Sequence, residues 1–305
     1  MGFVDVFYYG QGRLLCTSTA SADNGKTVSI ANAAGRTWSG TLASGKCEFV
    51  LPPKDRYTVS LINSGVTEYT TTVDFGFGDF KEVPVGMDAT TPRGIKNIVN
   101  AGLESDFFTA GDQITLKESG VDATFDVLHV GYRLGTYGHN IILGRHDPLP
   151  NTRQMQTTNT NAGGYMATLV ASYLDGEYFN NLDEAWRDVI SEITFQASVG
   201  SQGTALQNEE HKVWLPMEYN IFGATTYAAG TEHTTGLNEQ FAYFVSAPNR
   251  IKAINGSAVY WWGSSPSVSG STAFCIVNAS GTAGSNYASD SCGVVPCFMI
   301  AADAS

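Results

Sequence analysis

Short runs in which apolar and polar residues alternate fill much of the first 88 residues. One run lies at 47–51, and similar runs follow at 57–61 and 71–75. A period of two places alternate side chains on one face of a strand, and runs about ten residues apart, separated by Gly, Pro and Asn, are typical of a β-sandwich. Residues 1–88 are therefore expected to form a β-sandwich.

The first nine residues fit the same pattern. They contain one acidic residue, Asp5, and no basic residue, so they do not resemble a signal peptide. They alternate like a strand instead. No apolar run in the chain approaches the ~20 residues that a membrane-spanning helix requires. We therefore expect neither a secretion signal nor a membrane partner.

The period changes from that of a strand to that of a helix after Thr91. Thr91 is a favourable N-cap residue, and Pro92 suits the first helical position. Apolar residues then follow at helical spacing from Ile95 onward. This change predicts a boundary between a first domain at 1–88 and a second domain at 89–305.

The second domain is expected to combine strands with two or three helices. Alternating or continuous apolar runs predict strands at 125–130 and 140–143, and helical spacing predicts a helix at 165–174. A further helix is expected to begin at Asn181, because Glu184 three residues later suits a capping box. The fold class expected for the whole chain is α+β.

The charge of the chain excludes several classes of partner. Only 15% of the residues are charged and the net charge is −12, whereas charged residues usually make up about 25% of a globular chain. The 17 basic residues form no cluster, and none follows Lys252. Because a phosphate-binding surface needs clustered Lys and Arg, neither nucleic acid nor an anionic membrane surface is an expected partner.

No arrangement of residues predicts catalysis or metal binding. The sequence contains neither a Gly-x-Ser-x-Gly nor a His-Glu-x-x-His motif. His139, Arg145, His146 and Asp147 crowd one loop and could ligate a metal or shift a pKa, but a polar turn before Pro148 is the favoured interpretation. Asp74 and Asp79 lack the spacing of an EF-hand loop, so calcium binding stays open. The five cysteines include no Cys-x-x-Cys pair and are expected to be reduced, buried residues at 16, 47, 275, 292 and 297.

The most specific pattern lies near the C-terminus. Tyr260-Trp261-Trp262-Gly263-Ser264-Ser265-Pro266 and Gly293-Val294-Val295-Pro296-Cys297-Phe298 bracket loops rich in Ser, Gly, Thr and Asn. Aromatic side chains with Ser, Gly and Asn are well suited to recognition of another molecule. Adjacent tryptophans on a strand face opposite sides, so at least one is expected to pack in the core. The expected ligand-binding residues are Trp262, Ser264, Ser265, Ser267, Asn278, Asn286, Tyr287, Ser289 and Asp290, with solvated loops as the alternative.

These C-terminal motifs resemble those of an uncharacterised family common in gut Firmicutes and their phages. Members of the family end in the pattern "YWLRSP…F..VN..G…GVRPAF.I". The segments 91–112 and 212–223 are also similar to family motifs, in the same order, and together the resemblance covers about residues 91–300. This chain departs from the pattern where Ser264 and Val295 replace two arginines, which would be plausible partners in internal ion pairs.

The resemblance implies a C-type-lectin-like domain over residues 89–305, with two or three helices and a C-terminal strand and loop region. The shorter stretch 45–59 resembles Ig-like sandwich modules found beside carboxypeptidases, which implies an Ig-like β-sandwich over 1–88 that serves as a spacer or attachment unit.

The function implied is that of a non-enzymatic phage virion protein on the tail or baseplate. Residues 1–88 would bind other virion proteins, and the second domain would bind a glycan or protein on the host cell. The chain would assemble in the host cytoplasm and act at the virion surface, as a homotrimer by analogy with phage fibres, without cofactor or metal. Two alternatives remain open, a capsid decoration or other purely structural virion protein, and a bacterial surface glycan-binding adhesin.

Overall fold

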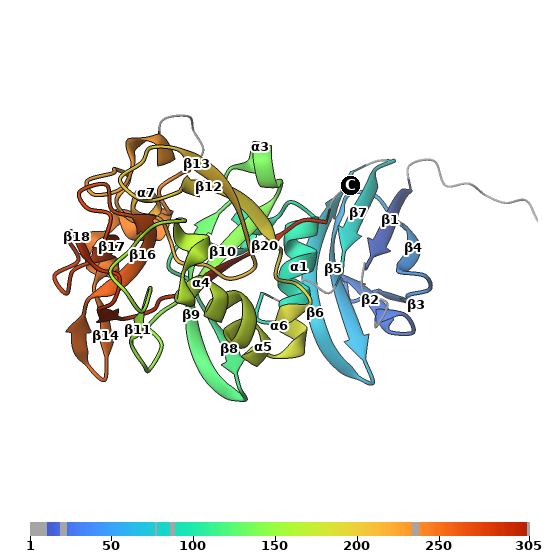
Figure 1. Cartoon of the computed structure of the whole chain (residues 1–305). Helices are drawn as coiled ribbons and strands as arrows, with labels where there is room; N and C mark the ends of the chain where they lie inside the picture. The colour runs from blue at the N-terminus through green and yellow to red at the C-terminus, as the bar shows by residue number, and fades with distance from the viewer. Residues whose placement is uncertain (1–10, 19–22, 77, 86–88, 234–237, 304–305) are drawn as a thin grey trace, which may run out of the picture. The chain divides into compact units, whose positions relative to one another are not determined.

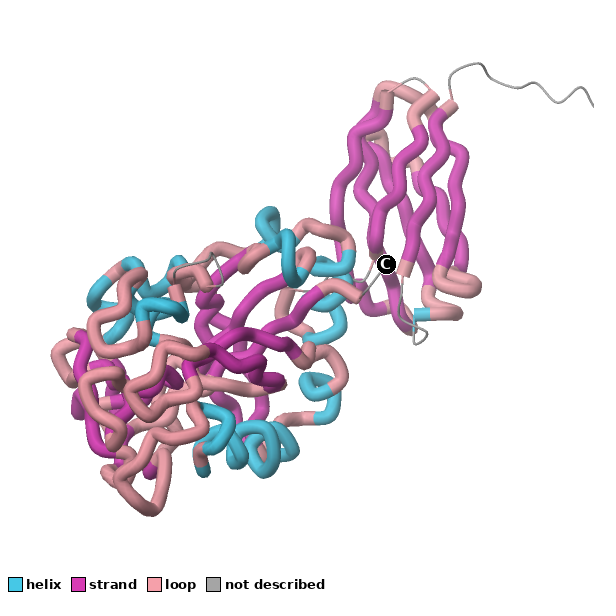
Figure 2. The backbone as a smooth tube through the Cα atoms, turned by 45° about the horizontal axis from the view of Figure 1, so that its top comes forward, coloured by secondary structure: helices cyan, strands magenta, loops and turns pink. Residues whose placement is uncertain are grey.

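The computed structural model describes residues 11–18, 23–76, 78–85, 89–233 and 238–303, so the strand expected in the first nine residues lies outside the described part. The chain divides into two compact units, Met1–Ala101 and Gly102–Ser305. Both are rich in strands, and the helices are short (Figures 1 and 2). The division falls after helix α1 (Pro92–Asn100), not at 88/89 as expected, because the contacts of α1 group it with the first unit.

The first unit contains two sheets, of three and four strands. Five of the seven described strands join their neighbours in antiparallel pairs alone, whereas β7 runs parallel to β1. The predicted runs at 47–51, 57–61 and 71–75 all lie within strands, as expected. In spatial order, the sheets are β4 (Lys46–Leu51), β1 (Gly12–Thr17) and β7 (Phe80–Pro84), and β3 (Thr37–Thr41), β2 (Thr27–Asn32), β5 (Asp55–Asn63) and β6 (Val66–Phe75).

Aromatic residues fill the space between these sheets. Tyr57 is fully buried, and its ring lies 5.6 Å from that of Trp38 and 5.8 Å from that of Phe75. The Phe75 ring on β6 lies directly against Gly12 on β1, where it leaves no room for a Cβ atom. The two sheets therefore pack face to face, and the alternation that predicted the strands is the alternation of buried and exposed side chains.

Helix α1 begins as its sequence predicts. Thr91 is the N-cap, and its Oγ1 accepts a hydrogen bond from the Gly94 N–H at 3.2 Å. Pro92 occupies the first turn, where its missing N–H has no intrahelical partner to lose. Ile95, Ile98 and Val99 form its buried face.

A four-stranded antiparallel sheet forms the centre of the second unit. The last described strand of the chain pairs with β10, so residues about 150 positions apart in the sequence lie side by side (Figure 1). The predicted strands at 125–130 and 140–143 are confirmed. In spatial order, the strands are β20 (Cys297–Ala301), β10 (Asn140–Arg145), β9 (Val121–Val130) and β8 (Gln113–Glu118).

A smaller antiparallel sheet and three strand pairs complete the β structure. The sheet lies at the end of the second unit that carries the β18 label in Figure 1. It consists of β16 (Trp261–Pro266), β17 (Ala273–Val277) and β18 (Ala283–Tyr287). The pairs are β11 (Arg153–Gln154) with β19 (Ser291–Cys292), β12 (Ile193–Ser198) with β13 (Leu206–His211), and β14 (Lys252–Ile254) with β15 (Ser257–Val259).

The helices of the second unit are all short, and no helix in the described part of the chain is long and apolar enough to cross a membrane. They are α2 (Glu104–Phe107), α3 (Leu134–Tyr137), η2 (Tyr165–Ala167), α4 (Leu169–Tyr173), the π-helical turn η3 (Leu174–Tyr178), α5 (Phe179–Asn181), α6 (Glu184–Arg187), α7 (Glu218–Phe222), η4 (Gly230–Glu232), η5 (Ala242–Val245) and η6 (Ala247–Arg250).

Both helices predicted in this unit are present, but one of them begins later than expected. The predicted helix at 165–174 corresponds to η2 and α4. The helix predicted with Asn181 as its cap corresponds to α6, but Asn181 ends α5 and Asp183 is the N-cap. Leu182 instead forms an isolated β-bridge with Glu118, and this tertiary pairing interrupts the helical pattern.

The aromatic packing of the first unit predicts a strong dependence on Phe75. We expect Phe75→Ala to lower the free energy of unfolding of this unit by about 3–5 kcal/mol, since it leaves a cavity against β1. Phe80 on β7 is 56% exposed, so Phe80→Ala serves as a control with an expected change below about 1 kcal/mol. Urea unfolding followed by tryptophan fluorescence measures both, and equal losses would contradict this packing.

Candidate functional site

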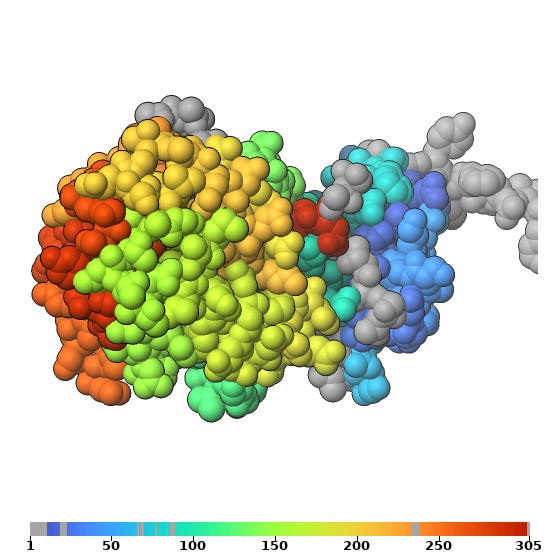
Figure 3. All heavy atoms as spheres, in the orientation of Figure 1, coloured from blue at the N-terminus to red at the C-terminus, as the bar shows by residue number. Residues whose placement is uncertain are grey.

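Seven of the nine predicted ligand-binding residues lie on the strands β16, β17 and β18 or in the loops between them. The other two, Ser289 and Asp290, lie in the turn that follows β18. Figure 3 shows that most of the visible orange and red surface, which belongs to the C-terminal segments, lies at one end of the second unit. Strand β17 is buried along its whole length, and β16 is also buried at every position. Only the loops and β18 therefore reach the surface here.

Four of the predicted ligand-binding residues are in the interior, which corrects that prediction. Trp262 is fully buried, and Ser264, Ser265 and Ser267 are each 1% exposed. The indole Nε1 of Trp262 donates a hydrogen bond to the Arg153 carbonyl at 2.8 Å. These residues are inaccessible because β16 lies inside the unit, whereas its sequence suggested a strand with one open face.

Both adjacent tryptophans pack in the core. Trp261 is also fully buried, and its Nε1 donates to the Arg250 carbonyl at 2.8 Å. Each indole thus satisfies its single donor while burying a large apolar surface, which is the usual requirement for a tryptophan in a core. The expectation that at least one tryptophan packs in the core is confirmed for both.

One buried serine of β16, Ser265, links the strand to two buried glutamates. Ser265 Oγ donates to Glu232 Oε2 at 2.6 Å and accepts the Glu218 N–H at 3.1 Å. The Ser198 N–H donates to Glu232 Oε1 at 2.9 Å. Burial raises the pKa of Glu232 to about 7, although the hydrogen bonds from Ser265 and Ser198 partly oppose this shift. Ser264 Oγ is buried without a hydrogen-bond partner in the described part of the chain.

Glu218 uses its carboxylate to hold a loop. It accepts backbone N–H groups of three successive residues, at distances between 2.7 and 3.1 Å, from Thr226, Tyr227 and Ala228. Burial raises the pKa of Glu218, and these three N–H donors oppose the shift. Glu218 therefore contacts β16 through its backbone N–H and residues 226–228 through its carboxylate, whereas the Glu232 carboxylate contacts both Ser265 and Ser198.

A second buried cluster surrounds His211. Its Nδ1 lies 2.5 Å from Asp175 Oδ2, and its Nε2 lies 3.3 Å from Glu209 Oε2. Burial disfavours the imidazolium, but the hydrogen bonds to the two carboxylates outweigh burial and raise the pKa of His211 to about 9. Because both ring nitrogens are engaged, this histidine has no free nitrogen with which to act as a general base.

The remaining predicted residues differ in their roles. Asn278 is half-buried, and its Nδ2 donates to Thr282 Oγ1 at 3.1 Å and to the Ala283 carbonyl at 3.0 Å, so it stabilises a turn. Asn286, Tyr287, Ser289 and Asp290 reach the surface at the end of β18 and in the turn after it. Among these, Tyr287 is 56% exposed.

Asn286 and Tyr287 line an open hollow of about 370 Å³. Ser285 and Thr272 contribute hydroxyl groups to it, and no charged residue belongs to its described lining. We call this hollow the tip hollow, lined by Ser269, Gly270, Thr272, Ala273, Ser285, Asn286 and Tyr287. One wall of the hollow is formed by β18, which pairs with the buried strand β17 along its length.

The sequence predicted some of the residues that line the tip hollow but not all of them. It identified Asn286 and Tyr287 but did not single out Thr272 or Ser285. The sequence did contain a signal for Ser285, because it is two residues from Tyr287 on the same strand and therefore lies on the same face. Thr272 precedes β17 and reaches the hollow only through the pairing of Ala273 with Tyr287.

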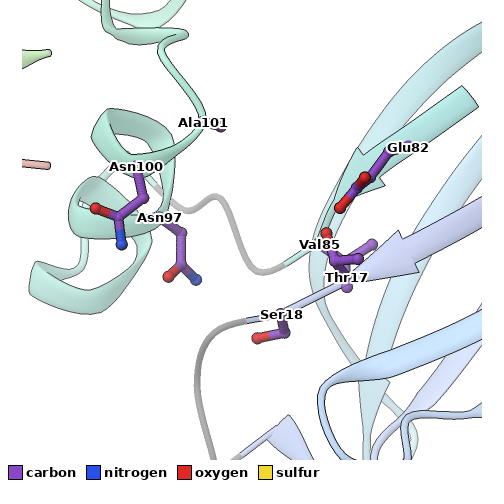
Figure 4. A pocket seen from close by; sticks show the side chains of 7 residues that line it. All are labelled: Thr17, Ser18, Glu82, Val85, Asn97, Asn100 and Ala101. Atoms are coloured by element: carbon purple, nitrogen blue, oxygen red, sulfur yellow. The ribbon is translucent and has the colours of Figure 1, made fainter. Parts of the chain in front are cut away.

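Another hollow, of about 320 Å³, lies within the first unit. Figure 4 shows Glu82 and Thr17 on one side of it and Asn97 and Asn100 of α1 on the other. Its lining contains one carboxylate and no basic residue among those described. Nothing in this lining forms a pair of groups suited to acid–base or nucleophilic chemistry.

The residues considered for metal binding do not converge. Within the described residues, no group of three or more His, Cys, Asp and Glu side chains could hold a metal ion. His139 contacts Glu104 and His146 contacts Asp126, so the two histidines of the 139–147 loop face different carboxylates. All five cysteines are free, and all but Cys47 are buried.

Sequence reasoning also missed one buried charge cluster. Lys252 is 3% exposed, and its Nζ lies 3.5 Å from Asp126 Oδ2. His146 Nδ1 approaches the same carboxylate at 2.9 Å. Burial lowers the pKa of Lys252, and the Asp126 charge opposes this. Because the three residues are far apart in the sequence, no spacing pattern could have predicted that they lie together.

The structure therefore defines a β-rich protein of two units, the second of which presents an uncharged hollow on a rigid sheet. The chain belongs to the family described as "Domain of unknown function (DUF6273)", whose profile matches residues 138–302. No curated protein matches the sequence.

Three solved structures show low similarity to the chain. The Bacillus anthracis TIE protein is 24% identical over 25% of this chain and 16% of its own length, with a TM-score of 0.22. A fimbrial protein from Bacteroides ovatus is 8% identical over 95% of this chain and 71% of its own, with a TM-score of 0.27. A pilus adhesin from Streptococcus pneumoniae is 10% identical over 66% and 33%, with a TM-score of 0.17. These TM-scores are too low to establish a shared fold.

The interior position of Trp262 predicts that it stabilises the unit and does not bind ligand. We expect Trp262→Ala to lower the free energy of unfolding by about 3–5 kcal/mol. Tyr287→Ala should change it by less than about 0.5 kcal/mol, since the ring is mostly exposed. Chemical denaturation compares the two variants, and a small loss for Trp262→Ala would contradict its burial.

The raised pKa values of Glu232 and His211 predict that stability falls as pH rises. Folded Glu232 holds its proton up to about pH 7, whereas an unfolded glutamate titrates near about 4.3, so its contribution declines across that window. The contribution of His211 is complete below about pH 6.5 and is lost as pH rises through its folded pKa of about 9.

Glu232→Gln separates the two contributions. The variant should flatten the decline in unfolding free energy between about pH 4.3 and 7, by roughly 1–3 kcal/mol, and leave the decline above pH 7 in place. Urea titrations at pH 5, 7 and 9 measure both slopes. An unchanged lower slope in the variant would show that Glu232 is not the group responsible.

Proposed function

We propose that this chain is a non-enzymatic recognition protein whose tip hollow binds a neutral glycan on a cell surface. The observation that carries the proposal is the exposed ring of Tyr287 beside an uncharged hollow of about 370 Å³. Ligand-binding hollows commonly begin at about 300 Å³ and combine aromatic surface with a few polar groups.

The chemistry of the tip hollow suits a sugar better than a charged ligand. A tyrosine ring offers a flat apolar surface to the C–H face of a pyranose, and its hydroxyl adds a hydrogen bond. Thr272, Ser285 and Asn286 supply donors and acceptors for sugar hydroxyls. Because no described lining residue is charged, the hollow has nothing to offset the cost of desolvating an ion.

The rigid support of the hollow also favours recognition. Tyr287 and Asn286 stand on β18, which is fixed by pairing with β17, and the Asn286 amide lies 3.4 Å from Cys292 Sγ. A binding surface that is already ordered loses little conformational entropy when a ligand arrives. The buried carboxylates behind β16 serve the same purpose, since they hold the loops that surround the sheet.

The setting in which the protein acts is proposed from the sequence resemblance. A place on a phage tail or baseplate, with the first unit bound to other virion proteins in a homotrimer, would present the tip hollow to a host cell. A bacterial surface adhesin would use the same hollow, whereas a purely structural capsid protein would leave it unoccupied. Mass spectrometry of purified virions and of cell-surface fractions distinguishes these settings.

The proposal is tested by binding to host cells and to an array of neutral glycans. We expect saturable binding by the wild-type protein and a loss of at least about ten-fold for Tyr287→Ala, equivalent to about 1.4 kcal/mol. Tyr260→Ala is the matched control, because Tyr260 is 52% exposed in the same unit but does not belong to the described lining of the hollow.

Equal binding by wild-type protein and Tyr287→Ala would contradict the placement of the site. Absence of saturable binding to any neutral glycan or host cell would overturn the function itself. Binding to cells that persists after enzymatic removal of surface glycans would redirect the proposal to a protein receptor.

A further inference from the structure

A second hollow in the second unit contains a positive charge that lacks a partner. It has a volume of about 310 Å³ and shares no described lining residue with the tip hollow. Its aromatic and polar lining includes Tyr173, Tyr178, Asn151 and Asn181, and its basic residues are Arg145 and Arg153. We call it the arginine groove.

Arg153 is held in place but is not neutralised. Its guanidinium carbon lies 3.3 Å from the centroid of the Tyr173 ring, so the planar group is stacked on the aromatic face. Its backbone is fixed by pairing of β11 with β19 and by the hydrogen bond from Trp262. Within the described residues, its guanidinium forms no salt bridge or hydrogen bond, and its Nε is buried without an acceptor.

The other described charges of the arginine groove are paired. Arg145 Nε donates to Glu118 Oε1 at 3.0 Å, and Tyr178 Oη donates to the same oxygen at 2.5 Å. Asp122 lies 2.6 Å from the Nζ of Lys117. Arg153 is therefore the one charged residue in the described lining without an ionic partner, in a chain whose net charge is −12.

We propose that the arginine groove binds an acidic sugar through its carboxylate, with Arg153 as the anchor. A guanidinium can bind a carboxylate through two parallel N–H···O bonds, and stacking on Tyr173 already fixes the plane from which these bonds would extend. Asn151 and Asn181 supply amides for sugar hydroxyls, as the tip hollow does with its own polar groups. This site is additional to the proposed neutral-glycan site, since it is lined by different residues and would select a negatively charged sugar.

A monoanion fits the arginine groove better than a dianion. Only one positive charge is free, and the carboxylates of Glu118 and Asp122 also line the groove. A phosphate monoester would bring up to two negative charges near these two carboxylates, whereas a sugar carboxylate brings one and can still pair with the guanidinium through two parallel hydrogen bonds. The ligand class is therefore a uronic or sialic acid residue.

The test is isothermal titration of the full chain with D-glucuronate and N-acetylneuraminate, with D-glucose and inorganic phosphate as comparison ligands. We expect saturable binding of one of the two acids, weakened at least ten-fold by Arg153→Gln. Arg153→Lys should also weaken it, because lysine keeps the charge but lacks the planar fork. Affinity should fall as salt rises from 50 to 500 mM.

Arg36→Gln is the matched control. Arg36 stacks at 5.0 Å on the ring of Trp38 in the first unit, so this variant removes the same charge and the same type of contact from outside the groove. It should bind as the wild type does. Unchanged melting temperatures of the three variants would show that each remains folded.

Three outcomes would overturn this proposal. They are the absence of binding by either acid, equal binding by wild-type protein and Arg153→Gln, and a preference for phosphate over both acids. Tyr287→Ala keeps these titrations separate from the tip hollow, because it should leave acid binding unchanged. Acid binding without neutral-glycan binding would therefore reject the proposed function and retain this inference.

Discussion

The hydrogen bonds between Ser265 and the buried groups of Glu232 and Glu218 are the constraint on which the second unit depends. Through them, strand β16 is attached to η4 and to α7, and the Glu218 carboxylate in turn attaches α7 to the loop at 226–228. Each buried carboxylate accepts at least two hydrogen bonds, which is the condition under which a polar group can be buried without a large cost. This network holds β16 in the interior beside the buried strand β17, so that β18 and the loops form the outer surface.

This arrangement separates stability from recognition along a short stretch of chain. The buried tryptophans and serines of β16 support the sheet, whereas the polar groups twenty residues later, around Tyr287, face solvent. Recognition through Tyr287 would therefore tolerate substitution in its loops without loss of the core. The arginine groove shows the same division, because Arg153 is fixed through its backbone and through Tyr173 while its hydrogen-bonding groups remain unused.

Local sequence patterns predicted the positions of strands and helices better than they predicted which residues lie on the binding surface. Alternation placed β4, β5 and β6, and Thr91 with Pro92 placed α1, because both signals act between residues close in sequence. The same reasoning placed the N-cap of α6 at Asn181 instead of Asp183, because a β-bridge from Leu182 to Glu118 separates α5 from α6. It also assigned Trp262 and three serines to the binding surface, since burial of a whole strand depends on the residues that cover it. Those covering residues, such as Glu232, come from distant parts of the chain.

The central claim is that ligand binds at Tyr287 on β18 and not along β16. Backbone NMR of the deuterated, ¹⁵N-labelled protein, titrated with the glycan fraction of a susceptible host surface, tests it most directly. The account predicts fast or intermediate exchange shifts confined to residues 269–273 and 285–287. Shifts concentrated at 261–267, with residues 285–287 unaffected, would contradict it.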